Sequence, residues 1–384
     1  MTPRLGAYVI GLDHLRAFAA VMVFSWHGLH QLGVPFGTVP NSWIASLMEE
    51  GWIGVSLFIT ITGFVFTIQT HGKKIEYFAF LKNRFLRLVP LIFLVTLYAV
   101  NVEGKSNQSL FLFFGLLGGG TVYGTWTLIV EFQFYAAYPF LRERLVFDSV
   151  TKTIGCCGLL LLFLTVLRVA CFSTMGSAQN LAYWTIFGQG DAFIAGILAG
   201  LMFLHLRDHP PRSGTIVYVT SIAVSFTGIV CAAHWFNAFG GFYNQAFHPS
   251  RSVVWIFWPT IIAVLWASTL VFYCLLTLQR RDRLTRSIAY LGTISYSTYM
   301  LHFITLGLSD KVYRKFVDVR FFDADIWNST AILLLFHYPI TIAMSAISYE
   351  IIEKAFLQYR VPYLTERNPS SIQTDKVSPM AVAA

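Results

Sequence analysis

The sequence predicts an all-α, polytopic membrane protein with about ten transmembrane helices. Of its 384 residues, 56% are hydrophobic and only 12% are charged, whereas an average soluble domain carries about 25% charged residues. The apolar residues form runs of the roughly 20 residues that a helix needs to cross a bilayer. The Lys and Arg residues cluster in the short segments between these runs. That pattern is typical of membrane topology and not of a nucleic-acid interface, despite the net charge of +8.

Ten apolar segments carry this prediction. They cover residues 8–31, 51–70, 87–102, 121–141, 153–172, 183–204, 214–236, 253–278, 287–307 and 329–352. A further apolar run at 109–118 is too short to span and ends in three glycines, so we expect a re-entrant or interfacial piece. We do not expect the first segment to be a cleaved signal peptide, because two ionisable residues interrupt it and further apolar segments follow.

The positive charges predict the orientation of the chain. With the N-terminus in the cytoplasm, 20 of the 27 Lys and Arg residues lie on the inner side and seven on the outer side. The positive-inside rule then places both termini in the cytoplasm. We expect one multi-pass domain in the inner (plasma) membrane, residues 1–363, and a short disordered cytoplasmic tail, residues 364–384.

Arg16 and His27 stand out because they lie inside the first apolar segment. Eleven helical residues make about three turns, so both side chains share one face, with His27 about 16 Å further along the axis. Ionisable groups at membrane depth are costly and commonly mark a functional path. The alternative is a structural His and an Arg whose guanidinium reaches the interface.

Glu131 is a second buried charge, in the segment 121–141. The predicted topology places Glu131 at a depth similar to that of His27. A carboxylate beside an imidazole fixes its tautomer and raises its basicity, as a general base requires. We therefore predict a His27–Glu131 pair. The alternative is that the two groups only satisfy one another as buried polar side chains.

Arg84 and Arg87 are three residues apart, and hence neighbours on one helical face near the start of the segment 87–102. With Arg16 they are predicted to form a cationic inner mouth, because guanidinium groups match phosphate oxygens. Asp13 precedes Arg16 by three residues and is placed to orient it. The alternative is ordinary flanking charge of the inner side.

Two further polar sets are weaker signals. Ser295, Tyr299 and His302 fall on nearly one helical face, where they would line a cavity or serve as interhelical hydrogen-bond partners. Asp191 opens a segment of small residues and is expected either to act in the site or to pair with Arg168. The five Cys residues have no metal-ligand spacing, so we expect no metal.

Five motifs in chain order resemble the acyltransferase-3 family of integral membrane O-acyltransferases. This family modifies surface polysaccharides, lipid-linked oligosaccharides, Nod factors and macrolides. The motifs are Leu12–Arg16 with His27, Gly54–Phe64, Arg84–Pro90, Thr125–Thr127 with Glu131, Gln133, Tyr135 and Pro139, and Ile294–His302.

The resemblance implies ten spans, a cytoplasmic acyl-CoA donor, no tightly bound cofactor, and transfer to a hydroxyl at the outer face. It implies His27 as the catalytic residue and Arg16 as its motif partner, with Arg84 and Arg87 on the donor side. Trp126 and Thr127 would shape the reacting end, and Ser295 and Tyr299 would complete the substrate site. Because the sequence stops soon after the tenth predicted span, we expect it to lack the hydrolase-like domain that some relatives carry.

The sequence departs from the usual motifs at four positions, namely His14, Thr62, Phe132 and Gln189. The expected activity is transfer of an acyl group, which we expect to be acetyl, to a glycan, a lipid-linked sugar or another small hydroxylated acceptor. The expected partners are the acyl-CoA, that acceptor and the lipid bilayer, without nucleic acid. The alternative is a proton-coupled transporter or flippase that uses the same His, Glu and Arg residues.

Overall fold

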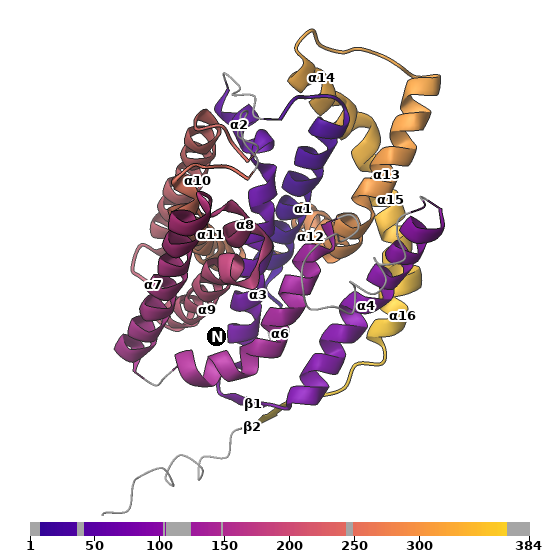
Figure 1. The fold of residues 1–384 in the computed structure, drawn as a ribbon. Coiled ribbons are helices and arrows are strands. Elements are labelled where there is room, and N and C mark those ends of the chain that lie inside the picture. Colours follow the sequence, from indigo (N-terminus) through magenta and orange to yellow (C-terminus); the bar gives the residue numbers. More distant parts are fainter. Residues whose placement is uncertain are drawn as a thin grey trace, which may run out of the picture.

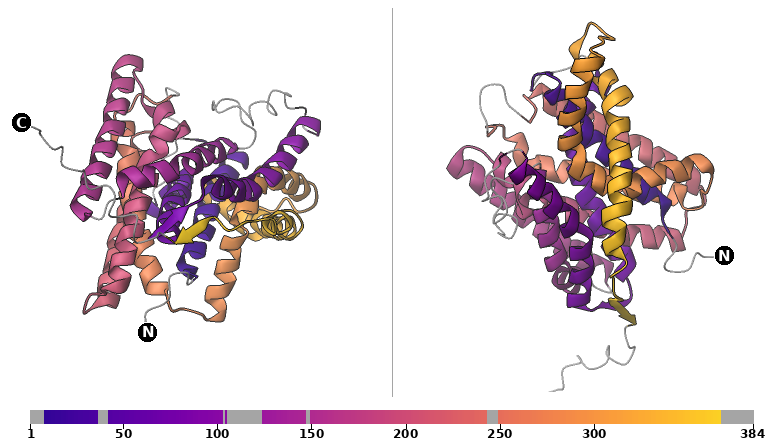
Figure 2. Two further views of the ribbon diagram at one scale, coloured as in Figure 1. Left: turned by 90° about the horizontal axis from the view of Figure 1, so that it is seen from below. Right: turned by 90° about the vertical axis from the view of Figure 1, so that its right-hand side faces the viewer.

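The computed structural model describes residues 8–36, 42–102, 104, 124–146, 149–242 and 249–366. These residues are almost entirely helical, with one two-stranded antiparallel sheet. Figures 1 and 2 show α7 and α10 on one side of the bundle and α4 and α15 on the other, with α1 and α3 between them. The prediction of an all-α polytopic membrane protein is confirmed.

The first half of the chain contains α1 (Ile10–Gln31), α2 (Trp43–Glu49), the 3-10 turn η1 (Gly51–Ile53), α3 (Gly54–Thr70), β1 (Lys73–Ile75), α4 (Tyr77–Asn101), α6 (Trp126–Leu145), α7 (Val150–Met175) and α8 (Gln179–Trp184). The second half contains α9 (Ile186–Asp208), α10 (Gly214–Ala238), α11 (Val254–Thr277), α12 (Arg283–Thr293), α13 (Ser295–Phe316), α14 (Asp325–Ile332), α15 (Tyr338–Ser348), α16 (Lys354–Leu357) and β2 (Leu364–Glu366). Two π-helical segments, η3 (Leu333–His337) and η4 (Tyr349–Glu353), join α14, α15 and α16 into one continuous helix.

Seven helical segments of the described chain are long and apolar enough to cross a membrane. They are Gly51–Thr70, Tyr77–Asn101, Val150–Met175, Ile186–Asp208, Gly214–Ala238, Val254–Thr277 and Asp325–Leu357. The remaining predicted spans coincide with the more polar helices α1, α6 and α13. The count of ten spans therefore stays a prediction, and the predicted re-entrant run at 109–118 lies outside the described residues.

Two predicted spans have different bounds in the structure. The span predicted at 287–307 is wrong as one helix, because the chain turns at Ile294 between α12 and α13. α12 also begins four residues earlier than predicted, at Arg283, where the Asp282 side chain caps it by accepting from the Thr285 N–H at 3.0 Å. The span predicted at 87–102 begins ten residues earlier, at Tyr77.

Small residues bring α3 and α9 into close contact at the centre of the bundle. A Cβ atom on Gly63 would lie 2.3 Å from the Phe193 carbonyl oxygen, and one on Gly196 would lie 2.2 Å from the Thr60 carbonyl oxygen. Only glycine allows backbones to approach this closely. The small residues that follow Asp191 therefore form a helix–helix contact, which positions α3 beside the candidate site.

Asp191 pairs with Arg168, as one of the two sequence alternatives predicted. The guanidinium donates to both carboxylate oxygens, at 2.7 and 3.0 Å, and to the carbonyl oxygen of Ile256 at 2.7 Å. Thr260 also donates to Asp191. Both charged side chains are buried, so this network joins α7, α9 and α11 as a structural element.

The segment after α16 folds back across the end of the bundle where α3 ends and α4 begins. β1 and β2 pair antiparallel, with Lys73 opposite Glu366. The Asn83 side chain exchanges two hydrogen bonds with the backbone of Val361, at 2.7 and 2.9 Å. The tail predicted to be disordered from residue 364 therefore begins with an ordered strand, because three residues of β2 find backbone partners far away in sequence.

Candidate active site

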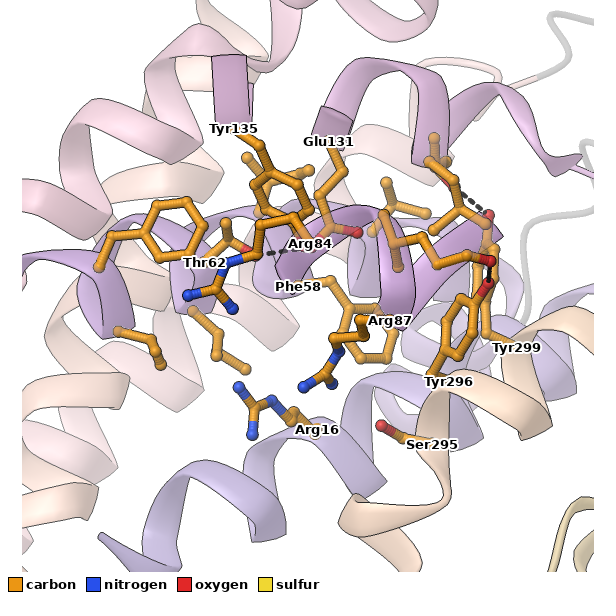
Figure 3. Close-up of a pocket in the computed structure, with 18 residues that line it drawn as sticks. Arg16, Phe58, Thr62, Arg84, Arg87, Glu131, Tyr135, Ser295, Tyr296 and Tyr299 are labelled. Carbon is orange, nitrogen blue, oxygen red and sulfur yellow. Dashed lines mark hydrogen bonds between the residues drawn. The ribbon is translucent and has the colours of Figure 1, made fainter. Parts of the chain in front are cut away.

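A cavity of about 80 Å³ lies between α1, α3, α4, α6 and α13 (Figure 3). This volume is large enough for several water molecules. Its lining residues are Arg16, Val55, Phe58, Ile59, Ile61, Thr62, Val65, Phe66, Arg84, Arg87, Leu88, Thr127, Leu128, Glu131, Tyr135, Ser295, Tyr296 and Tyr299. Seven of the nine residues predicted for the site line this one cavity. His27 and Trp126 do not.

Three arginine side chains converge in this cavity (Figure 3). Because α4 begins at Tyr77, Arg84 and Arg87 lie about 10 and 15 Å inside the helix. Both residues therefore lie in the first half of α4, and the cationic inner mouth stays a prediction. Arg16 reaches the same space from α1.

The three guanidinium groups have different surroundings. Arg84 is packed among the rings of Phe66, at 4.7 Å, and Phe80, at 4.9 Å, a cation–π arrangement that holds it in place. Arg16 donates to Asp13 at 2.8 Å, as its spacing predicted. Arg87 makes no hydrogen bond within the described residues, so its donors remain available to a ligand.

Glu131 lies in the cavity but does not orient His27. Its carboxylate accepts a hydrogen bond from Thr62 at 3.0 Å and another from Tyr135. The predicted His27–Glu131 pair is therefore wrong. Similar depth in the membrane does not imply a shared helix face, and Glu131 points toward α3 and the arginines (Figure 3).

Hydroxyl groups close the cavity on the side of α13. The Tyr299 hydroxyl lies 2.7 Å from the Thr127 hydroxyl and donates to the carbonyl oxygen of Gly124 at 3.1 Å. Ser295 lines the wall one turn before Tyr299. Trp126 instead packs on Tyr183, with 4.7 Å between the ring centroids, so its predicted part in shaping the reacting end is not supported.

His27 lies beside the cavity among aromatic rings. Its imidazole centroid is 4.3 Å from that of Phe303 and 5.0 Å from that of His302. His302 is in turn bonded through Nδ1 to the carbonyl oxygen of Tyr299, whose side chain lines the cavity. Tyr299 thus connects the cavity to the His27–His302 pair.

Residues 358–366, the segment after α16, form a C-terminal strap. This strap adds a charge and an aromatic ring that the sequence did not indicate. Arg84 donates to the hydroxyl of Tyr363 at 3.2 Å. Burial lowers the pKa of Arg360 to about 10, with the positive charges of Arg87 and Arg84 adding to the shift. Arg360 therefore remains a cation at neutral pH. No local sequence signal places these residues near α4, because the chain returns there only through the strap.

The charges and walls of the cavity suit a ligand with anionic and apolar parts. Three guanidinium groups face one carboxylate, so the lining has an excess of positive charge. The opposite wall is apolar, formed by α3 residues such as Val55, Phe58 and Ile59. The described residues hold no group of three or more His, Cys, Asp or Glu side chains that could bind a metal ion.

Fold and cavity together define a multi-pass membrane protein with an internal cavity lined by three arginines. Residues 9–350 match the family described as Acyltransferase domain, so the chain belongs to the acyltransferase-3 family. The match runs from the start of α1 to the start of η4 and includes every residue of the cavity.

One curated relative is the Bacillus subtilis (strain 168) protein named "Putative peptidoglycan O-acetyltransferase YrhL". It is 22% identical over 383 aligned residues, which cover 90% of this chain and 54% of the relative. The chain thus spans about half the length of this relative. No solved structure matches the chain.

Proposed function

We propose that this protein transfers an acetyl group from cytoplasmic acetyl-CoA to a hydroxyl of a glycan at the outer face of the inner membrane. The observation that carries the proposal is the convergence of Arg16, Arg84 and Arg87 in one cavity with an apolar wall. Buried cations at membrane depth are costly unless they serve a ligand or a pathway. A phosphate-bearing thioester has the matching charge and shape.

The donor would bind with its phosphates against the guanidinium groups and its pantetheine arm along α3. The N–H groups of Arg87 are available to bind phosphate oxygens, and the rings around Arg84 fix the position of its guanidinium group. Arg16 and His27 are about 16 Å apart along α1. A pantetheine arm resembles four to five extended residues, or roughly 15 Å, so it can reach from the arginines to His27.

His27 would act as the general base. It takes the proton of the acceptor hydroxyl while that oxygen attacks the thioester carbonyl. The new C–O bond forms, the C–S bond breaks, and the proton on His27 passes to the departing thiolate to give free CoA. As charge develops on the carbonyl oxygen, the Tyr299 hydroxyl would turn from the carbonyl oxygen of Gly124 to donate to it, and Thr127, 2.7 Å away, would donate to Tyr299.

The name of the relative supports a cell-wall glycan as the acceptor, and its O-acetyl product supports acetyl as the group transferred. A lipid-linked sugar offers the same chemistry, a secondary or primary hydroxyl. The position of His27 near the far end of α1 supports an acceptor that enters from the outer side.

The test uses membranes containing the protein, acetyl-CoA labelled in the acetyl group, and fractions of peptidoglycan, lipid-linked sugar and free lipid. We expect label to move into one glycan fraction with the wild type and with His209→Ala, an exposed control. His27→Ala should lose at least about 100-fold of the rate, the contribution of a general base. Undiminished transfer by His27→Ala would refute the role of His27. Substrate movement without any transfer would support a transporter instead.

A further inference from the structure

His302 is buried beside His27 and holds one defined tautomer. The residue is 1% exposed. Its Nδ1 atom lies 2.5 Å from the carbonyl oxygen of Tyr299. A carbonyl oxygen can only accept, so Nδ1 carries the hydrogen of the neutral ring. Nε2 therefore presents a lone pair.

This Nε2 atom has no hydrogen-bond partner within the described residues. A buried acceptor left without a partner costs roughly 1–3 kcal/mol, and native proteins retain few of them. Such an acceptor next to a candidate catalytic residue indicates that it gains a hydrogen-bond donor during the reaction.

His27 lacks the complementary group. It makes no hydrogen bond in the described part of the chain, although a catalytic base is commonly oriented by a third group. Glu131 does not supply this group, because no hydrogen bond or ion pair joins it to His27 within the described residues, and Thr62 and Tyr135 both donate to its Oε1 atom.

The two imidazoles are stacked and lie within reach of a hydrogen bond between them. Their centroids are 5.0 Å apart and their planes differ by 29°. An N–H···N bond of about 3 Å between two such rings places the centroids about 5 Å apart. Because the bond to Tyr299 holds the His302 ring, the hydrogen bond would form when the His27 ring turns until its N–H points at Nε2 of His302.

We propose that His302 is the positioning residue of His27, with its Nε2 lone pair accepting the N–H of the His27 imidazole. This inference rests on the proposed function. When His27 takes the proton of the acceptor hydroxyl, both of its nitrogens carry hydrogen, and the second N–H donates to His302. After the proton passes to the thiolate, both rings return to their neutral forms. A neutral acceptor performs this task without a further buried charge.

Two isosteric substitutions separate this role from a structural one. His302→Gln retains an amide oxygen near the place of Nε2. His302→Asn retains an N–H near the place of Nδ1, which can donate to Tyr299, but it ends short of His27. We expect His302→Gln to keep kcat within about 10-fold of the wild type and His302→Asn to lose about 100-fold or more. The KM for acetyl-CoA should stay within about 2-fold in both, because His302 does not line the cavity.

A purely structural role predicts the reverse order, since only the bond to Tyr299 would matter. Equal activity of His302→Asn and the wild type, or a folded His302→Gln as impaired as His302→Asn, would overturn the inference and leave the proposed function intact. No transfer by the wild type would overturn both. If His302→Asn is not monodisperse in detergent, His302→Ala with added imidazole replaces it. Rescue is expected, and a folded variant that imidazole does not rescue would contradict the proposal.

Discussion

The buried Arg168–Asp191 pair gives the sharpest stability prediction. Asp191→Asn removes the charge with little change of shape and leaves the Arg168 guanidinium uncompensated. The carboxylate accepts three hydrogen bonds, two from Arg168 and one from Thr260. Breaking one partner of a buried ion pair costs about 3–5 kcal/mol. Few residues of α7 are buried against the other helices, so other contacts of α7 contribute little. The loss of this pair should therefore lower the stability of the whole protein by nearly the full amount.

This cost predicts a measurable change in thermal stability. At about 1.2 °C per kcal/mol for 384 residues, Asp191→Asn should lower Tm by roughly 4–6 °C. The assay is thermal unfolding in detergent, followed by size-exclusion chromatography of the remaining monodisperse protein. Asp208→Asn is the matched control, because its partner Arg207 lies at the surface end of α9, where an ion pair contributes at most about 1 kcal/mol.

The double variant Arg168→Met with Asp191→Val completes the test. Replacing a buried pair by apolar residues is often nearly neutral, so the double variant should recover most of the lost Tm. A Tm for Asp191→Asn within 1 °C of the Asp208→Asn control would refute the reasoning. Acyl transfer per folded molecule, measured well below Tm, should be unchanged in all these variants, since the pair lies outside the cavity.

Two further predictions concern packing and pH. Gly196→Ala should destabilise by about 2 kcal/mol or more, because its Cβ would lie 2.2 Å from the Thr60 carbonyl oxygen; Gly158→Ala, with no atom within 4 Å, should be neutral or stabilising, and equal Tm values would contradict this. Burial raises the pKa of Glu50 well above its usual range, against the hydrogen bond from Trp52 and with the help of Glu49. Glu50 thus binds its proton more tightly in the folded than in the unfolded protein. Protonated Glu50 therefore stabilises the folded state at low pH, and this stabilisation is lost as pH rises through the folded-state pKa. Glu50→Gln should therefore raise Tm more at pH 8 than at pH 5, with exposed Glu143→Gln as the control; a larger gain at pH 5 would contradict the assignment.

The site illustrates how far sequence reasoning reaches in a membrane protein. The expense of charge at membrane depth singled out Arg16, Arg84, Arg87 and Glu131, and the structure places all four around one cavity. That argument succeeds because a charge cannot face lipid, so its side chain must turn inward. The cost of charge at membrane depth does not determine which inward-facing side chains contact each other. The predicted partner of His27 was therefore wrong.

Local patterns by themselves determined the helical class, the approximate spans and the family. Hydropathy over some 20 residues and the spacing of motifs are properties of contiguous sequence. They also located the small residues that let α3 and α9 touch.

Only the tertiary structure decided the rest. The rotation of each helix about its axis joined Glu131 to Thr62 and His27 to His302, and turned Trp126 away from the cavity. The turn at Ile294 and the strap that carries Tyr363 to Arg84 depend on contacts between distant segments. The physical reason is that the depth of a side chain in the membrane follows from the apolar residues around it in the sequence. Its contact partners depend instead on how other helices pack against its own helix.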